Sequence, residues 1–184
     1  MLRILLIFYF IILPFKAFAL IEVDITRGNL NPLPIAVSPL SIDETSRQNF
    51  EKILKKKDIG AEIALVVEKN LKASGLFNPL NKDAFLQKPD IANLKPRFED
   101  WNLIKAQALI TGKVNIVEEK LRVEFRLWDV LAGKEMMALA FTTVPENWRR
   151  VGHIITDKVY QRLTGEKGYF DTRIIYVSEK GPKT

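Results

Sequence analysis

The sequence predicts an α/β chain of the α+β type, in which a mixed β-sheet with an antiparallel meander packs against two main helices. Three observations predict this class. Apolar and charged side chains alternate strictly from Leu121 to Leu127, as in a strand with one buried face. Residues 59–74 and 147–163 carry apolar side chains three and four positions apart, as amphipathic helices do. Hydrophobic residues make up 47% of the 184 residues, enough for the core of one domain or slightly more.

The composition excludes several kinds of active site. The chain has no cysteine, which excludes disulfides, thiolate zinc sites, cysteine nucleophiles and iron–sulfur clusters. Its single histidine, His153, cannot form a multi-histidine metal site within one chain. There is also no phosphate-binding glycine loop, dinucleotide fingerprint or H-E-x-x-H motif. We therefore expect no cofactor and no metal, and the formal net charge of +6 is too small to indicate nucleic acid as a partner.

Residues 1–19 have the features of a secretory signal peptide. A basic residue precedes an unbroken apolar run at 4–13, and Ala17 and Ala19 supply the small residues that a signal peptidase requires. The run is too short for a membrane-spanning helix, which needs roughly 20 residues. We expect cleavage after Ala19 rather than an uncleaved anchor or a buried core segment. Loss of two basic residues and no acidic one would leave an exported chain of charge +4, without a stable membrane span.

The mature chain would begin with residues 20–25 (LIEVDI), which alternate between apolar and polar side chains. This pattern is typical of a short strand or an extended peptide. At a free N-terminus such a peptide can pair with the edge of a partner's sheet, but it can equally be the first strand of its own domain. The pattern leaves both possibilities open. Pro34 to Pro39 follows as a second short strand, and its prolines favour strand ends over a central position.

The middle of the chain predicts one long helix with less regular segments around it. Residues 41–57 are polar and end in the cluster Lys55–Lys57, which is an anion patch or, as we favour, part of a solvated loop or helix face. Asp58 is expected to cap a helix from Ile59 to about Ser74, and Gly75 to end it in the left-handed conformation. The segments that follow are a turn at 77–80 leading into a strand or loop, a mixed linker at 81–95 and a short helix within 96–105.

The clearest strands form the meander. Three strands separated by short turns are predicted at residues 108–117, 121–128 and 135–143. A last helix is expected from about Asn147 to Leu163, with Gly165 as its end. After it, residues 169–177 have strand composition but no partner strand following, which indicates the opening of a second domain.

Candidate catalytic groups are few. His153 is the one group expected to titrate near neutral pH, but it lies beside the apolar stripe of the last helix with no serine or acid at a triad spacing. Glu99–Asp100 falls at a helix start and Glu118–Glu119 in a hairpin turn, where structural roles are favoured over an acid–base pair. The three tryptophans are spread over three elements and are expected to anchor the core or an interface. We predict that the chain is not an enzyme.

Several stretches together resemble the amino-terminal part of the TolB family of the Tol-Pal system. They are Pro34–Val37, Ser74–Leu80, Ala108–Val114 and, most specifically, Leu163–Val177. The resemblance implies an α/β domain over residues 20–166, after the signal peptide at 1–19. It also implies that residues 167–184 form a linker and the first strand of a six-bladed β-propeller, whose remainder the sequence does not contain.

The resemblance also implies a function. It implies a non-enzymatic periplasmic adaptor that links TolA of the inner membrane to Pal of the outer membrane, for outer-membrane integrity and invagination during cell division. Pal would bind the propeller, and TolA would bind the mature N-terminus, with one row of apolar side chains as contacts. The residues carried over as the TolA site are Leu20, Ile21, Glu22, Val23, Asp24 and Ile25.

Two other functions compete with the adaptor on the sequence alone. The charge of +4 after cleavage and the cluster Lys55–Lys57 fit a stand-alone exported binding module for anionic lipid or polysaccharide. An exported hydrolase would depend on His153 and on no other observation.

Overall fold

The computed structural model describes residues 31–172 of the chain. The predicted cleavage site at Ala17 and Ala19, the segment Leu20–Ile25 and the predicted strand beyond Thr172 lie outside these residues. The described elements, in chain order, are β1 (Leu33–Val37), β2 (Ser41–Ile42), α2 (Glu44–Leu54), α3 (Ile59–Ala73), β3 (Phe77–Pro79), the 3₁₀ turn η1 (Lys82–Ala84), α4 (Pro89–Leu94), α5 (Phe98–Leu103), β4 (Ala108–Val117), β5 (Lys120–Asp129), β6 (Lys134–Thr143), the 3₁₀ turn η2 (Pro145–Asn147) and α6 (Trp148–Thr164).

The sheet is mixed, as predicted, and its six described strands include the antiparallel meander. Its strand order is β3-β1-β4-β5-β6, with β2 also paired to β4. β1 is parallel to β3 and β4, whereas β4, β5 and β6 are successively antiparallel. Glu118 and Glu119 have φ of 51° and 61° and form a two-residue turn between β4 and β5, so β5 begins at Lys120, one residue earlier than predicted. A turn with positive φ at both central residues matches the right-handed twist of the two strands that it joins.

β1 lies inside the sheet although it contains a proline. Its ladder with β4 begins at the pair Ile35 and Ala108, and the carbonyl of Pro34 accepts a hydrogen bond of 3.0 Å from Gln107 N–H. Proline has no backbone N–H. An N–H at position 34 would face the part of the chain just before Ala108, where β4 has not yet begun, so the β1–β4 ladder loses no hydrogen bond. Pro39 therefore lies beyond the end of β1, as predicted, and Pro34 is the second residue of β1, ahead of its ladder with β4. Phe77–Pro79, predicted as a turn, is itself an edge strand of the sheet.

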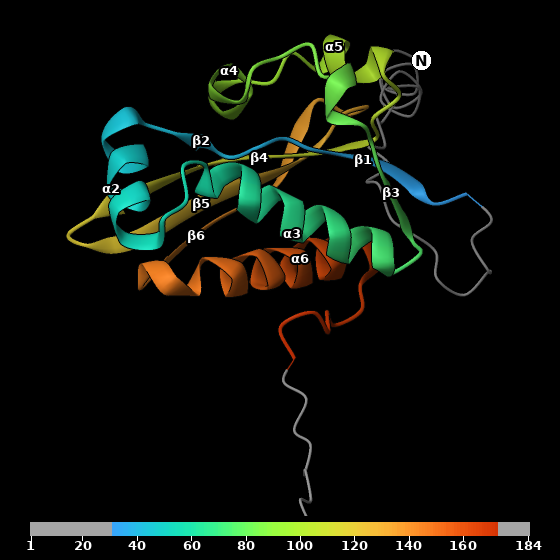
Figure 1. Cartoon of the computed structure of the whole chain (residues 1–184). Coiled ribbons are helices and arrows are strands. Elements are labelled where there is room, and N and C mark those ends of the chain that lie inside the picture. Colours follow the sequence, from blue (N-terminus) through green and yellow to red (C-terminus); the bar gives the residue numbers. More distant parts are fainter. Residues whose placement is uncertain (1–30, 173–184) are drawn as a thin grey trace, which may run out of the picture.

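The two main helices, α3 and α6, pack against each other and cover one face of the sheet (Figure 1). Their predicted ends are confirmed, because Asp58 accepts a hydrogen bond of 2.9 Å from Ala61 N–H while Gly75 and Gly165 have positive φ. The main core lies between these helices and the strands. Its fully buried members include Ile35, Phe50, Ile59, Ile63, Leu71, Ile110, Leu121, Phe125, Leu127 and Ile155.

A second, smaller core lies on the opposite face of the sheet, beneath the segment that carries η1, α4 and α5 (Figure 1). Residues 81–95, predicted as a mixed linker, contain both η1 and α4. Gln87 holds this segment in place, because its buried Oε1 accepts 2.8 Å hydrogen bonds from Trp101 Nε1 and from Arg97 N–H. The predicted short helix is confirmed as α5, with Trp101 buried at its centre.

Candidate functional site

The cluster Lys55–Lys57 lies in a shallow hollow where α2 ends and α3 begins. The hollow has a volume of about 450 Å³ and is also lined by Lys82, Asp58 and Glu62. Lys55 is the C-cap residue of α2 and takes a left-handed conformation, with φ of 56°. The cluster therefore belongs to a connection between two helices, as the sequence analysis favoured.

The positive charge of this hollow is largely paired. Lys56 Nζ lies 3.1 Å from Glu62 Oε1 and 5.2 Å from the ring centroid of Trp148. Lys57 and Lys82 form ion pairs of 3.6 Å with Glu51 and 2.8 Å with Glu68. An anionic ligand would have to compete with these carboxylates, so the geometry does not favour this hollow as an anion site.

His153 lies at the contact between α3 and α6. Its Nδ1 is 2.8 Å from Asn70 Nδ2, and the same amide group donates to Thr156 Oγ1 at 3.2 Å. Asn70 Nδ2 is a donor only, so Nδ1 of His153 is the acceptor in this contact. The half-buried structural role predicted for His153 is confirmed, and no nucleophile is hydrogen-bonded to it within residues 31–172.

The other candidate groups also serve the fold. Asp100 forms a 2.6 Å ion pair with Arg97 at the start of α5, and Trp101 and Trp148 are buried in the two cores. Over the described range no three histidine, aspartate or glutamate side chains come together as a metal site would require. Within the same range, no helix has the length and apolar character needed to cross a bilayer.

The chain leaves the domain through a segment that is held against α6. The carboxylate of Asp157 accepts hydrogen bonds from Phe170 N–H at 2.7 Å and from Asp171 N–H at 3.1 Å. Arg150 forms two hydrogen bonds of 3.1 Å to the Asp171 carboxylate, and the Tyr169 and Phe170 rings contact the buried Tyr160. Residues 166–172 are thus part of the domain surface. This contact could not be predicted from a local sequence pattern, because it joins the Asp157 carboxylate on α6 to the amide of Phe170, 13 residues later in the chain.

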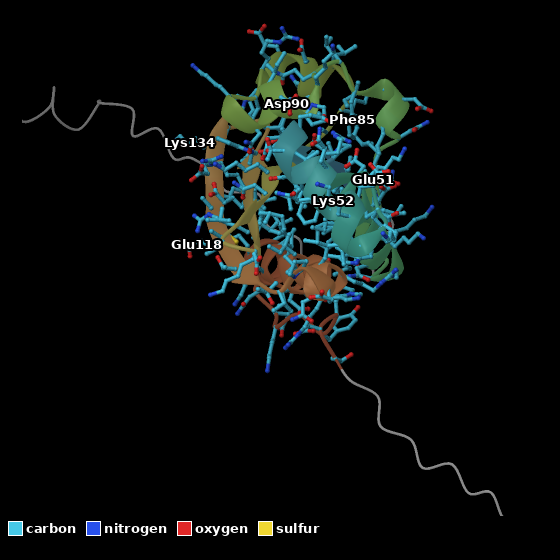
Figure 2. All side chains as sticks on the ribbon, turned by 60° about the vertical axis from the view of Figure 1, so that its left-hand side comes forward. Glu51, Lys52, Phe85, Asp90, Glu118 and Lys134 are labelled. Carbon is cyan, nitrogen blue, oxygen red and sulfur yellow. The ribbon has the colours of Figure 1, made fainter. Side chains whose placement is uncertain are left out.

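β6 is the last strand of the sheet among the described residues, and its outer side carries no further strand there. Figure 2 shows it running down the left-hand side of the molecule from Lys134 toward the hairpin at Glu118. From Met136 to Thr143 it contains no charged side chain. Leu139 is 38% exposed, and Ala138 and Ala140 are exposed as well.

The face of β5 and β6 that points away from α3 and α6 carries basic side chains beside these alanines. Arg126 pairs with Ala138 across the two strands, and Glu124 pairs with Ala140. Burial alone would raise the pKa of Glu124, but the hydrogen bond from Arg122 and the charge of Lys113 outweigh it and hold this pKa below its usual range. We call this surface the open face: Lys113, Arg122, Glu124, Arg126, Ala138 and Ala140.

The predicted TolA-binding residues, 20–25, lie outside the described range, so the structure brings none of them to a site. The sequence itself decides the family. Residues 21–136 match the family model of the TolB amino-terminal domain. The chain belongs to the TolB amino-terminal domain family. The resemblance drawn from the sequence is thereby confirmed, and the match begins two residues after Ala19.

One relative agrees with this family, and one solved structure shares the fold. The chain is 84% identical, over 175 residues, to the Tol-Pal system protein TolB of Pelagibacter ubique (strain HTCC1062). The alignment covers 95% of this chain and 39% of that protein, so the chain spans about two fifths of the length of this TolB relative. The crystal structure of TolB from Acinetobacter baumannii has the same fold, with a TM-score of 0.61 and 21% identity over 77% of this chain and 30% of the other.

Proposed function

We propose that the chain is the amino-terminal part of a non-enzymatic adaptor of the Tol-Pal system that works in the periplasm. The observation that carries the proposal is the match of residues 21–136 to the TolB amino-terminal domain, together with 84% identity to a protein named as a Tol-Pal component. The amino-terminal features of a signal peptide support export. In this proposal residues 1–19 are removed, 20–166 form the domain, and 167–184 supply a linker, which packs against α6 as far as it is described, and the first strand of the propeller.

The partner contact assigned to this chain is strand addition by the mature N-terminus. Residues 20–25 would pair with an edge strand of TolA, so that backbone hydrogen bonds provide affinity and one row of side chains provides specificity. Ile21, Val23 and Ile25 form the apolar row, whereas Glu22 and Asp24 form the other row. Pal would be bound by the propeller, so the adaptor would connect the two membranes for envelope integrity and for invagination at division.

A pair of double variants tests this contact. Val23→Asp with Ile25→Asp should abolish binding of the C-terminal domain of TolA in a calorimetric titration, because charges would replace the apolar row. The matched control, Glu22→Gln with Asp24→Asn, changes the other row and should retain most of the affinity. Circular dichroism should show the same folded domain in both variants. Unchanged affinity in the Val23 and Ile25 variant would refute the assignment of the site.

A further inference from the structure

β6 is a long sheet edge with little of the protection that such edges usually have. Natural sheets protect their edges with charged side chains, prolines or bulges, because an unprotected edge promotes pairing with other chains. β6 has one bulge, beside Met136, whose carbonyl accepts a hydrogen bond of 3.2 Å from Arg162 Nε. From there to Thr143 it has neither a proline nor a charge, and the exposed Leu139 lies at the centre of this stretch. β3, at the opposite end of the strand order, has three residues and ends in Pro79.

The hairpin between β4 and β5 determines which backbone groups of β6 face outward. In a two-residue hairpin the residues that flank the turn, here Val117 and Lys120, form a hydrogen-bonded pair, and such pairs alternate along an antiparallel ladder. Even-numbered residues of β5 therefore direct their N–H and C=O groups to β4, and odd-numbered residues direct theirs to β6. Residues 121–127 of β5 pair odd with odd and even with even across to β6. The outward groups of β6 are therefore those of even-numbered residues such as Ala138 and Ala140.

We propose that this edge pairs with the β6 edge of a second copy of the chain, antiparallel and about a two-fold axis at Leu139. Ala138 of each copy then lies opposite Ala140 of the other, and the two alanine pairs exchange hydrogen bonds through their outward N–H and C=O groups. Between these pairs, Leu139 of one copy faces Leu139 of the other, at the kind of position where antiparallel strands bring side chains closest. The two sheets would thereby join into one.

The apolar side of this edge is complementary to itself. With the axis at Leu139, Phe141 of one copy lies opposite Met137 of the other, on the same side of the sheet as Leu139. Phe141 already stacks on Phe125, with ring centroids 6.1 Å apart, so the Met137 thioether of the second copy would extend the stack. Leu139, which is 38% exposed in the single chain, would be covered by its counterpart. The pairing therefore buries the apolar row that the edge leaves exposed.

The charges of the open face select this register over its neighbours. Arg126 pairs with Ala138 across β5 and β6, and Glu124 pairs with Ala140. With the axis at Leu139, Arg126 of each copy is therefore in line with Glu124 of the other, separated from it by two alanines. Sliding one strand by two residues in either direction would instead bring like charges into line, two arginines or two glutamates. Such an arrangement is unfavourable, so the charge pattern is complementary only in the proposed register.

These charges exclude wrong registers and add little affinity. Arg126 keeps its ion pair of 3.2 Å with Glu135, and Glu124 keeps Lys113 and Arg122 at 3.4 and 2.9 Å. One strand from each copy is also a small interface, below the roughly 1,200 Å² of total buried surface at which stable complexes begin. We therefore expect a weak dimer that depends on concentration, and not a permanent one.

This pairing needs no TolA, so it can be tested on the chain alone, independently of the proposed function. Sedimentation velocity of the chain starting at Leu20 should show a monomer at about 5 µM and a growing dimer fraction toward about 500 µM, as expected for an interface of this size. Leu139→Lys should abolish the dimer, because two lysines would face each other at the axis. The matched control, Leu86→Lys, places the same charge at a leucine that is 60% exposed between η1 and α4, and should dimerise like the original chain.

A complementary pair of variants tests the position of the axis. Leu139→Glu alone should also stay monomeric, but an equal mixture of the Leu139→Lys and Leu139→Glu variants should dimerise, because opposite charges then meet. Circular dichroism should show the same fold in all of these variants. A dimer that persists in Leu139→Lys, a mixture that stays monomeric, or an original chain that is still monomeric at the highest concentration would each overturn the proposal.

A disulfide provides a test that introduces no charge at the edge. The chain has no cysteine, so a single introduced cysteine can be read without interference. Facing residues at the axis would have Cα atoms about 4.5 Å apart, within the range that a disulfide spans. Under mild oxidation Leu139→Cys should therefore form a covalent dimer, whereas Leu86→Cys, at an exposed position away from β6, should stay largely monomeric. Equal cross-linking of the two variants would contradict the pairing of β6 with a second copy.

Discussion

The carboxylate of Asp157, on α6, holds the backbone N–H of Phe170 at 2.7 Å and so fixes the path by which the chain leaves the domain. The approach is close, because a Cβ added at Gly168 would collide with the backbone and carboxylate of Asp157. Arg150 also forms a bidentate ion pair with the carboxylate of Asp171. The segment after α6 therefore has a defined position relative to the sheet, and whatever follows Thr172 begins from a fixed point.

Asp157→Ala should free this segment without unfolding the domain. Hydrogen bonds to a charged acceptor contribute roughly 1.5–3 kcal/mol each, and exposure reduces that value, so we expect a loss of about 1–2 kcal/mol. Hydrogen exchange should lose protection at the amides of Phe170 and Asp171, which the carboxylate binds. Lys158→Ala, at the exposed neighbouring position on α6, is the control and should leave both amides protected. Unchanged protection in the Asp157 variant would show that the aromatic contacts alone hold the segment.

Gly152→Ala should force α3 and α6 apart. A Cβ at position 152 would lie 2.8 Å from Cγ1 of Val66, inside van der Waals contact. Overpacking of this kind costs about 1–3 kcal/mol, which urea denaturation can measure. Val66→Ala in the same chain removes the obstructing methyl groups and should recover part of the loss. Equal stability of the single Gly152 variant and the original chain would contradict the close packing.

The meander and the two main helices could be predicted because each repeats a pattern over many residues. Leu121 to Leu127 alternates, and α3 has both an apolar stripe and an N-cap residue, Asp58. β3 could not be predicted in this way, because three residues carry no period and its pairing with β1 is a contact across 44 positions. α2 was not identified as a helix because its buried residues are only Ser46 and Phe50, too few to form a visible stripe.

The remaining differences between the predicted and the observed features have local causes that leave no pattern in the sequence. The segment 81–95 is ordered by the buried amide of Gln87, and a single glutamine predicts nothing by itself. The predicted TolA site followed from alternation and from the family resemblance, and it lies outside the described residues. The β6 edge and the open face were not predicted as a surface, although the uncharged run from Met136 to Thr143 was a signal that could have identified them.

Because Asp43 is the N-cap residue of α2, the free energy of unfolding of the domain should depend on pH in the acidic range. Ser46 donates its N–H and its hydroxyl to the Asp43 carboxylate, each at 2.8 Å, and the backbone hydrogen bond is the main reason that the pKa of Asp43 is lowered. Because the pKa is lower in the folded state, this stabilisation is present above the ordinary carboxyl pKa of about 3.9 and is lost as the pH falls below it.

Asp43→Asn keeps an oxygen that can cap the helix but cannot titrate. Between about pH 6 and pH 3, its free energy of unfolding should therefore fall less than that of the original chain. Urea denaturation at each pH provides the measurement, and Asp90→Asn, which removes an exposed carboxylate on α4, controls for the loss of one negative charge. An equal fall in the original chain and the Asp43 variant would disprove the role given to this cap.

The paired lysines should bind anionic membranes poorly. Lys56, Lys57 and Lys82 already face carboxylates, so at about 0.15 M ionic strength we expect little cosedimentation with vesicles rich in anionic phospholipid. Lys55→Gln with Lys57→Gln should change this result little. Strong binding that falls with salt and disappears in the double variant would instead favour the anionic-lipid module that the composition also allowed.

The most direct test of the adaptor function compares two lengths of the chain. A chain starting at Leu20 and a chain starting at Asn31 should be titrated, under identical conditions, into the C-terminal domain of TolA. The account predicts saturable binding by the longer chain and none by the shorter one, although both should have the same circular dichroism. Equal binding by the two chains would place the contact on the folded domain and would contradict the assignment to residues 20–25.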